Sequence, residues 1–443
     1  MNLSCFRLFY GKVVPNCQRF LFPCSISHLN YKSNIILNDV YKRNIHLHNR
    51  LWQKRVENEN HDALEIILPN LIIKQIPVSN SSYFYEQFLN CPPGHLEDLK
   101  YNSMVDGLVQ EIYKMDFDQI FNVLNALSTW NLGDKSFAKN FSKIWTLIDD
   151  RLTSHIQGIN LQDNQTLSRL LAFAVLYYKI GISRINKYNK ALLEKVASSK
   201  LSLDKENLLF LAFMFNIQRS VEYYLIEPIM LNFISLIDQM SIDEIAVVCL
   251  ALFKTKYKIP MEIMDKIISK FNDELLNISN FTMGSLCKAL RFSLNRNYTN
   301  QIDQVLRKAT SNLSKFNQPI KVHVILLADQ YEIYNSQLFD YMINDLCDNI
   351  TTYRLKDIDR ILHCFSTFNH KVDTNKLKFI SDYLCDNDQL ENYPICSIAS
   401  LLYMSILDFY PEKFIRKCFQ PKFLSKLESK NFNSMHFIYY LIA

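Results

Sequence analysis

Glycine is scarce in this chain of 443 residues, which contains seven glycines, all isolated from one another. A loop that cradles nucleotide phosphates needs clustered glycines so that the backbone can approach the phosphate oxygens. The scarcity therefore argues against P-loop nucleotide hydrolases, dinucleotide-binding folds and active protein kinases. All-β folds, which use glycine and proline at many turns, are also disfavoured.

Residues that would carry redox, metal or catalytic chemistry show no characteristic spacing. The eleven scattered cysteines include no Cys-x-x-Cys pair, which favours reduced thiols over a disulfide framework. In the body of the chain only His363 and His370 lie close together, two helical turns apart, and they lack the further ligands that zinc requires. Hydrolase, metalloprotease and kinase motifs are missing. We expect no catalytic residue, metal, cofactor or small-molecule substrate.

Long hydrophobic runs are missing as well. The longest apolar stretches, such as residues 245–253, fall far short of the roughly 20 residues that a membrane-spanning helix needs. No membrane span is therefore expected.

Positive charge is concentrated at the N-terminus. Residues 1–55 contain nine Lys and Arg residues against a single acid, Asp39, a net charge of +8. Because the whole chain carries +5, residues 56–443 carry about −3. A basic, acid-poor segment rich in Ser, Phe and Leu is typical of a mitochondrial transit peptide. We predict that residues 1–55 are such a peptide and that the protein enters the mitochondrial matrix; the alternative is a disordered basic tail.

The remaining chain divides at a cluster of helix-breaking residues. Residues 56–99 contain Pro69, Pro77 and the Cys-Pro-Pro-Gly sequence at 91–94, so an irregular linker is expected there. From residue 100 onward, apolar residues recur at intervals of three and four, the helical period.

One helical pattern repeats along the chain. Eight apolar residues are each followed, three and four positions later, by apolar or small residues. Successive members of this set of eight are 47, 41, 37, 41, 36, 36 and 37 residues apart. We call these the anchor residues: Ile120, Leu167, Leu208, Ile245, Leu286, Val322, Ile358 and Ile395.

A second apolar stripe follows several anchors, as at Met264, Ile267, Ile268 and Phe271. Two helices of about 15 residues and two turns fill the repeat. The spacing predicts an all-α fold, an α-solenoid of about eight helix-pair repeats of 36–41 residues, in which each pair buries its face against its neighbours. A non-repeating helical bundle is the alternative.

A basic residue follows five of the eight anchors by ten to thirteen positions. These ladder residues are Lys179, Arg219, Lys256, Arg296 and Lys371. Equivalent positions in a solenoid align along one edge, where a row of cations could follow the phosphates of a single-stranded RNA. The alternative is that each cation only complements the dipole at the C-terminal end of a helix.

Three segments carry a resemblance to a known family. Residues 241–254 (SIDEIAVVCLALFK) are similar to the SxEEIxxxCLxxFK helix of the FAST kinase domain-containing proteins. Residues 356–371 (KDIDRILHCFSTFNHK) resemble the first FAST motif of that family. Tyr393-Pro394 and residues 407–412 (LDFYPE) resemble the opening of the second. The resemblance spans about residues 200–443, and more loosely 100–200.

The resemblance implies helical repeats over residues 100–316, a region like the first FAST motif over 317–390 and the start of a region like the second over 391–443. Family members are matrix proteins that act in the processing, stability or translation of mitochondrial RNA, among other proteins of mitochondrial RNA granules, and the kinase of their name is not a working kinase. They normally end in an endonuclease-like RAP domain, and we expect this sequence to stop at Ala443 before one.

Together, these expectations predict a non-catalytic mitochondrial RNA-binding scaffold that supports transcript processing, stability or maturation. The alternative is a mitochondrial solenoid that binds other proteins without touching RNA, an idea favoured by the slightly acidic body of the chain.

Overall fold

The computed structural model describes residues 48–67, 76–78, 81–129, 138–182, 186–218, 221–386 and 393–428. Every regular element within these ranges is helical, which confirms the predicted all-α class. The chain divides into two compact units, Met1–Glu57 and Asn58–Ala443. In the first unit the described part is the beginning of one helix, α3 (His48–Ile67). The predicted transit peptide otherwise falls outside the described residues.

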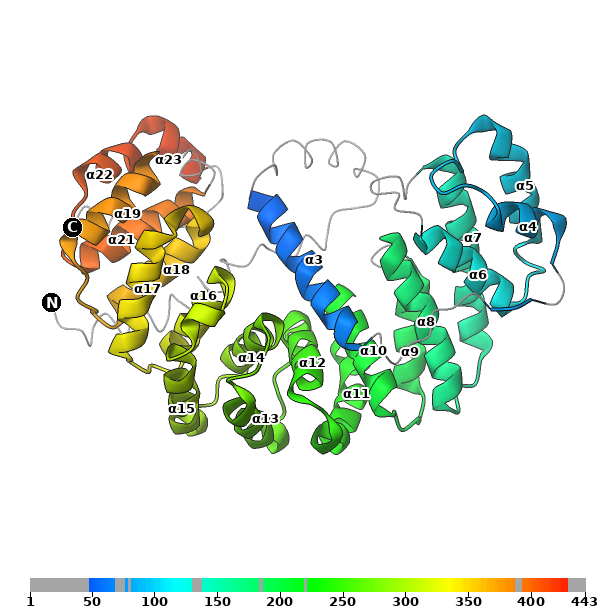
Figure 1. The fold of residues 1–443 in the computed structure, drawn as a ribbon, viewed down its shortest axis with the longest axis horizontal. Helices are drawn as coiled ribbons and strands as arrows, with labels where there is room; N and C mark the ends of the chain where they lie inside the picture. The colour runs from blue at the N-terminus through cyan, green and yellow to red at the C-terminus, as the bar shows by residue number, and fades with distance from the viewer. Residues whose placement is uncertain are drawn as a thin grey trace. The chain divides into compact units, whose positions relative to one another are not determined.

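The second unit contains two sets of helices that alternate along the chain (Figure 1). Each anchor residue lies in a different helix of the first set, which we call the first helices. They are α6 (Phe117–Thr129), α8 (Asn164–Ile180), α10 (Lys205–Gln218), α12 (Ile242–Thr255), α14 (Asn280–Phe292), α16 (Gln318–Gln330), α18 (Leu355–Thr367) and α21 (Pro394–Ile406).

The second helices follow the first helices in the chain. They are α7 (Lys139–Gly158), α9 (Tyr188–Ser198), α11 (Tyr223–Leu236), α13 (Met261–Glu274), α15 (Thr299–Thr310), α17 (Ser336–Asp348), α19 (Thr374–Asp386) and α22 (Glu412–Cys418). Each first helix packs against the first helices before and after it, and α7 against α9 and α13 against α15 show the same neighbour packing in the second set. The remaining described α-helices are α4 (Tyr83–Leu89), α5 (Asn102–Glu111) and α23 (Pro421–Glu428).

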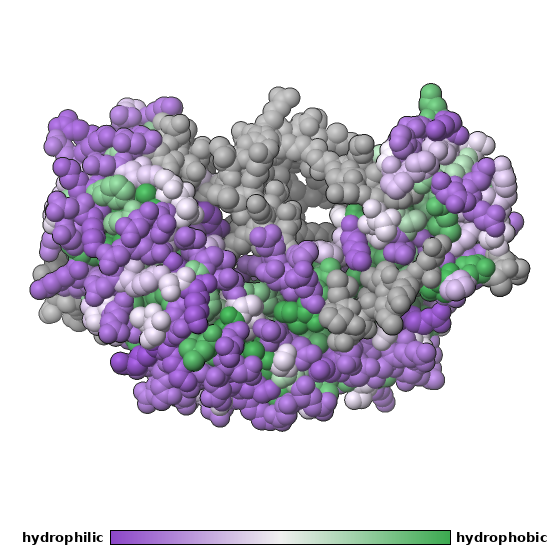
Figure 2. Space-filling model, in the orientation of Figure 1, coloured by the Kyte–Doolittle hydropathy of each residue, from purple (hydrophilic) through white to green (hydrophobic). Residues whose placement is uncertain are grey.

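The anchor pattern identifies the buried face of each first helix. All eight residues three positions after an anchor are buried, and so are all eight residues four positions after it. The predicted second-helix stripe of Met264, Ile267, Ile268 and Phe271 is also buried, in α13. With these side chains inside, the face shown in Figure 2 is mainly hydrophilic over the described helices. Among the described residues, no helix combines the length and the apolar character needed to cross a membrane.

Side chains of one helix pair cap helices of the next pair. The buried carboxylate of Asp149 in α7 accepts hydrogen bonds from the backbone N–H groups of Lys187 (2.8 Å) and Tyr188 (3.1 Å), where α9 begins. Asn280 at the start of α14 accepts from the N–H of Asn317, the N-cap of α16, at 3.0 Å. N-terminal N–H groups have no partner inside their own helix, so these contacts join neighbouring pairs by satisfying them.

The structure differs from the expected irregular linker over residues 56–99. Part of α3 and all of α4 lie in this segment. The positions at which the prolines end helices were predicted correctly, because α3 ends before Pro69 and α4 ends before Pro92. Helix α3 escaped the pattern search because its sequence is polar and only a few apolar side chains of its described C-terminal half are buried.

Because the apolar side chains of the first helices are buried, shortening one of them to alanine should destabilise the protein strongly. Leu290→Ala in α14 removes a fully buried side chain and should lower the free energy of unfolding by about 2–5 kcal/mol. The matched control is Leu231→Ala in α11, where the leucine is 66% exposed, and its effect should be small. Chemical denaturation of both variants checks this expectation, and equal losses would contradict the assignment of the buried face.

Candidate nucleic-acid interface

Four of the five ladder residues lie in the described part of the chain, and all four are exposed. Lys179 lies in the last turn of α8, and Lys256 is the C-cap of α12. Arg296 lies four residues after the end of α14, and Lys371 lies four residues after the end of α18. The fifth ladder residue, Arg219, falls outside the described residues. The structure therefore brings each of the four to the C-terminal end of a different first helix.

The helix-dipole explanation accounts for only two of these cations. Lys179 and Lys256 adjoin the last carbonyl groups of their helices, where a positive charge is favourable. The backbone of Lys256 has a left-handed φ of 61°, and the next residue, Tyr257, donates its N–H to the carbonyl of Leu252 at 2.9 Å. The dipole acts over about the last helical turn, which Arg296 and Lys371 have passed.

Arg296 already has an acidic partner. Its Nη1 and Nη2 donate to Glu332 Oε2 and Oε1 at 3.1 and 2.8 Å, a two-point contact between exposed side chains. Exposed ion pairs contribute little to stability, about 0–1 kcal/mol. A phosphate could therefore compete for Arg296, but Glu332 makes this the weakest of the four described positions.

Aromatic rings accompany the ladder residues. Tyr257 follows Lys256 directly and stacks on Tyr223, with ring centroids 5.1 Å apart and an interplanar angle of 23°. Tyr223 is 64% exposed, and Tyr334, whose hydroxyl lies 3.1 Å from Nδ1 of His370 beside Lys371, is 50% exposed. Exposed aromatic faces beside cations are the combination that single-stranded nucleic acids use, since bases stack while phosphates pair with the cations. The charge pattern that identifies the ladder residues gives no signal for these rings.

A second group of cations was not found from the sequence. Lys254 of α12 and Lys288 of α14 both form ion pairs with Glu59 of α3, and each lysine side chain is only 7% exposed. Lys254 Nζ lies 3.8 Å from Glu59 Oε2 and donates to Oδ1 of Asn60 at 3.0 Å. Glu59 lies 195 and 229 residues before these lysines, so no local pattern could join them.

Further cations on the first helices are held by acids. Lys321 of α16, also nearly buried, donates to Asp345 of α17 at 2.6 Å. Arg354 at the start of α18 makes a two-point contact with Asp357, at 2.6 and 2.7 Å. Because removing one partner would leave an uncompensated buried charge, these pairs act as structural elements.

The contact between α18 and α21 buries groups with shifted pKa values. Burial raises the pKa of Asp359 to about 7, although the nearby Arg360 and Lys356 act in the opposite direction. Burial and the neighbouring Arg360 lower the pKa of Lys356 to about 8. Burial also raises the pKa of the Cys396 thiol to about 12. Asp359 is only 2% exposed, so its carboxyl group is not placed to reach a substrate.

Two clusters of metal-ligating side chains occur among the described residues: His61, Asp62 and Glu65 of α3, and Asp329 of α16 with His363 and Cys364 of α18. Burial raises the pKa of the Cys364 thiol well above its usual range, which disfavours the thiolate that binds metals. The cationic Arg291 acts on the same thiol and opposes a second positive charge. The spacing of two helical turns predicts that His363 and His370 share one helix face, and this is wrong, because α18 ends at Thr367.

Comparison with known proteins supports the resemblance found in the motifs. No protein-family model matches the chain. Among curated proteins, the mitochondrial FAST kinase domain-containing protein 5 of mouse is 20% identical over 323 residues, covering 70% of this chain and 42% of that protein. The human protein of the same name is 22% identical over 230 residues, covering 50% of this chain and 29% of its own length. The chain is thus similar to mitochondrial FAST kinase domain-containing proteins over half or more of its length.

This chain therefore spans less than half of the length of the FAST kinase domain-containing relatives reported above. Their shared description as mitochondrial supports the mitochondrial location that the basic N-terminus predicts. The SIDEIAVVCLALFK motif covers most of α12 and ends at Lys254, two residues before Lys256.

The raised pKa of Asp359 predicts a pH-dependent stability. In the unfolded chain the carboxyl group titrates near 3.8 and in the folded chain near 7, so the folded state holds the proton between these values. Stability should fall as the pH rises from about 4 to about 7. Asp359→Asn should reduce this fall, as measured by thermal midpoints across that range. The control, exposed Asp265→Asn in α13, should retain it. An identical pH profile for all three proteins would contradict the assignment.

Proposed function

We propose that this protein is an RNA-binding scaffold of the mitochondrial matrix that supports the processing, stability or maturation of mitochondrial transcripts. The observation that carries the proposal is the recurrence of exposed cations and aromatic rings at the ends of successive first helices. Lys256 with Tyr257, and Lys371 with Tyr334, are the clearest pairs. The similarity to mitochondrial FAST kinase domain-containing proteins supports the proposal independently.

The chemistry of the pairs favours single-stranded RNA as the partner. A cation contributes by displacing counterions from phosphate, and this contribution does not depend on sequence. An aromatic face accepts any unstacked base and contributes about 1–3 kcal/mol per base. Paired strands would keep their bases stacked inside a helix, away from rings such as Tyr223 and Tyr334.

We propose further that the helix pairs form an α-solenoid, which would make the ladder a continuous track. Support comes from the 36–41-residue spacing of the later anchors and from the packing of each first helix against its neighbours in chain order. In such an arrangement each pair adds one further contact point at the same relative position.

A scaffold agrees better than an enzyme with the environment of the ionisable groups. Asp359 and Cys396, whose pKa values are raised by burial, lie between α18 and α21. A catalytic acid or base must reach a substrate proton, directly or through one water. The ladder residues and the rings beside them are lysines, one arginine and tyrosines, which suit binding, although the exposed acid Glu332 lies among them.

Binding of another protein is the second candidate, and the net charge of about −3 over residues 56–443 favours it. The dependence of binding on salt separates the two functions. Phosphate contacts give a steep fall in affinity with salt, whereas a protein scaffold would show no affinity for RNA.

Charge reversal of the exposed lysines tests the track. The triple variant Lys179→Glu, Lys256→Glu, Lys371→Glu should bind single-stranded RNA roughly tenfold or more weakly and with a shallower salt dependence, because three phosphate contacts are lost. Fluorescence anisotropy with a labelled RNA pool measures both quantities, and circular dichroism should show unchanged helicity.

The matched control reverses three lysines of the second helices, Lys190→Glu, Lys266→Glu and Lys378→Glu. It changes the net charge equally, so a non-specific electrostatic effect would weaken both triple variants alike. Retention of tight binding by the ladder variant would contradict the track. Crosslinking of the protein to RNA inside mitochondria would then identify any bound transcript, and recovery of no RNA would favour the protein scaffold.

A further inference from the structure

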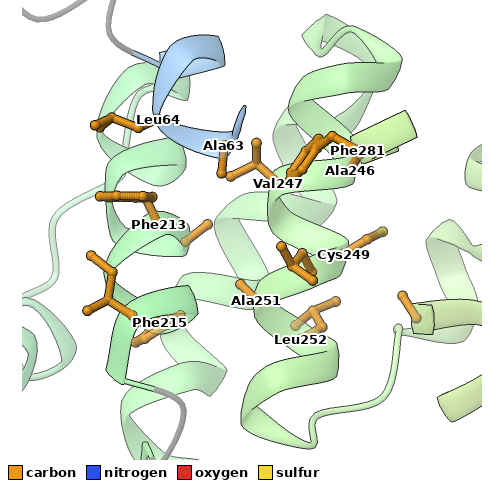
Figure 3. Packing of buried hydrophobic residues seen from close by; sticks show 14 of the residues in the cluster. Ala63, Leu64, Phe213, Phe215, Ala246, Val247, Cys249, Ala251, Leu252 and Phe281 are labelled. Atoms are coloured by element: carbon orange, nitrogen blue, oxygen red, sulfur yellow. The ribbon is translucent and has the colours of Figure 1, made fainter. Parts of the chain in front are cut away.

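Among the described first helices, five end in the same hydrogen-bonded turn. A residue with a left-handed backbone lies at or just after the helix end, and the next residue donates its N–H to the carbonyl five positions earlier. These contacts join Ile182 to Tyr177 (3.1 Å), Tyr257 to Leu252 (2.9 Å), Ile333 to Ala328 (2.9 Å), His370 to Phe365 (2.9 Å) and Phe409 to Met404 (3.0 Å). Leu252 belongs to the buried apolar cluster of Figure 3, so the turn after α12 is held by the packed part of the helix.

The left-handed residue is a glycine in α8 but has a side chain in the other four helices. It is Gly181 (φ 86°) in α8, Lys256 (61°) in α12, Glu332 (57°) in α16, Asn369 (48°) in α18 and Asp408 (58°) in α21. Glycine adopts this conformation without strain, whereas other residues adopt it at an energetic cost that is smallest for Asn and Asp. All four side chains are exposed, so packing does not explain why they occupy positions that suit glycine best.

The second residue after the left-handed position alternates between ring and cation over the last three of these helices. It is Tyr334 after α16, Lys371 after α18 and Tyr410 after α21. All three are exposed, the two tyrosines at 50% and 65%. Because α16 packs against α18 and α18 against α21, the three residues follow consecutive, neighbouring helices. This order suits a single strand whose bases stack on the rings and whose intervening phosphate pairs with the lysine.

Tyr334 joins the turn of α16 to the turn of α18. Its ring centroid lies 5.9 Å from that of Phe368 and 6.1 Å from that of His370, and its hydroxyl lies 3.1 Å from Nδ1 of His370. Phe368 and His370 are the two chain neighbours of Asn369. The ring therefore contacts the residues on both sides of Asn369, and a base stacked on the exposed part of Tyr334 comes next to the Asn369 amide.

The left-handed residues differ in the hydrogen bonds that they can make to a base. The Asp408 carboxylate only accepts, and guanine is the base whose Watson–Crick edge presents two adjacent donors, N1–H and N2–H. The Asn369 amide has one donor and one acceptor, which suits adenine, cytosine or uracil. The Glu332 carboxylate already accepts two hydrogen bonds from Arg296, at 2.8 and 3.1 Å. Asn369 and Asp408 are therefore the two positions best suited to contact a base edge.

We propose that Asn369 and Asp408 read two neighbouring bases of a single-stranded RNA and that Asp408 selects guanine. Tyr334 and Tyr410 stack the two bases, and Lys371 holds the phosphate between them. Helical-repeat proteins can read one base per repeat with two or three side chains. The inference rests on the proposed RNA-binding function and the proposed solenoid, and it adds base specificity to both.

The double exchange Asn369→Asp, Asp408→Asn tests the proposal most directly. Asn and Asp both tolerate a left-handed backbone, and the exchange leaves the net charge unchanged. The full chain is incubated with a single-stranded RNA pool of random sequence, and the bound RNA is sequenced. The wild type should enrich guanine at one position of the bound sequences. The double exchange should lower this enrichment roughly tenfold, because a two-point contact is lost, and should create guanine enrichment at the adjacent position.

A glycine variant separates the side chains from the backbone turn. Asn369→Gly, Asp408→Gly removes both amide and carboxylate and relieves the left-handed backbone, so its thermal midpoint should equal or exceed that of the wild type. It should still bind the RNA pool through the rings and the lysine, but with no base preference at either position. The matched control is Asp265→Asn on the second helix α13, which makes the same chemical change at an exposed position and should keep the wild-type preference.

The outcomes separate this inference from the proposed function. If the wild type binds RNA without guanine enrichment, or if the double exchange leaves the preferred bases unchanged, the inference is overturned while RNA binding stands. A change of base preference that Asp265→Asn shares also overturns it. If none of the proteins binds RNA, both proposals are overturned.

Discussion

The packing of each first helix between its neighbours constrains everything else in the described structure. In α10 every residue from Asn207 to Ile217 is buried, and α12, α14 and α16 are buried along most of their lengths. Helices enclosed on several sides must be apolar around most of their circumference, in contrast to the single stripe of a surface helix. The polar side chains that remain on them need partners, because an unpaired buried polar group costs free energy.

Those partners explain where charge can act. Inside the first helices, Asn207 donates to Asn164, and Lys321 donates to Asp345. Charged groups that are paired and buried in this way hold neighbouring pairs in register and are not available to a ligand. Ligand contacts are left to the helix ends, where the side chains are exposed. In α12 this boundary falls between the nearly buried Lys254 of the last turn and the exposed C-cap residue Lys256.

The sequence predicted the part of this arrangement that depends on periodicity. Eight anchors identified eight first helices because an enclosed helix repeats its apolar residues at three and four, and all sixteen following positions are buried. The helix ends could also be located, which placed Lys179 and Lys256 correctly. Helix α3 could not be found, because it contributes few buried apolar residues and its polar contacts are made with residues about 200 positions away. A separation of 36 residues concealed Glu332 as the partner of Arg296, and the left-handed Asn369 (φ 48°), which follows the end of α18, has no periodic signal.

The proposed RNA-binding role is compatible with the net charge of about −3 over residues 56–443, because positive and negative side chains lie in different places. A phosphate backbone responds to the local potential within about one Debye length, roughly 8–10 Å in physiological salt, and not to the sum over the chain. Acids such as Asp345 and Asp357 form ion pairs with nearly buried cations, so their negative charge is neutralised locally. Lys179, Lys256 and Lys371 remain exposed at the helix ends.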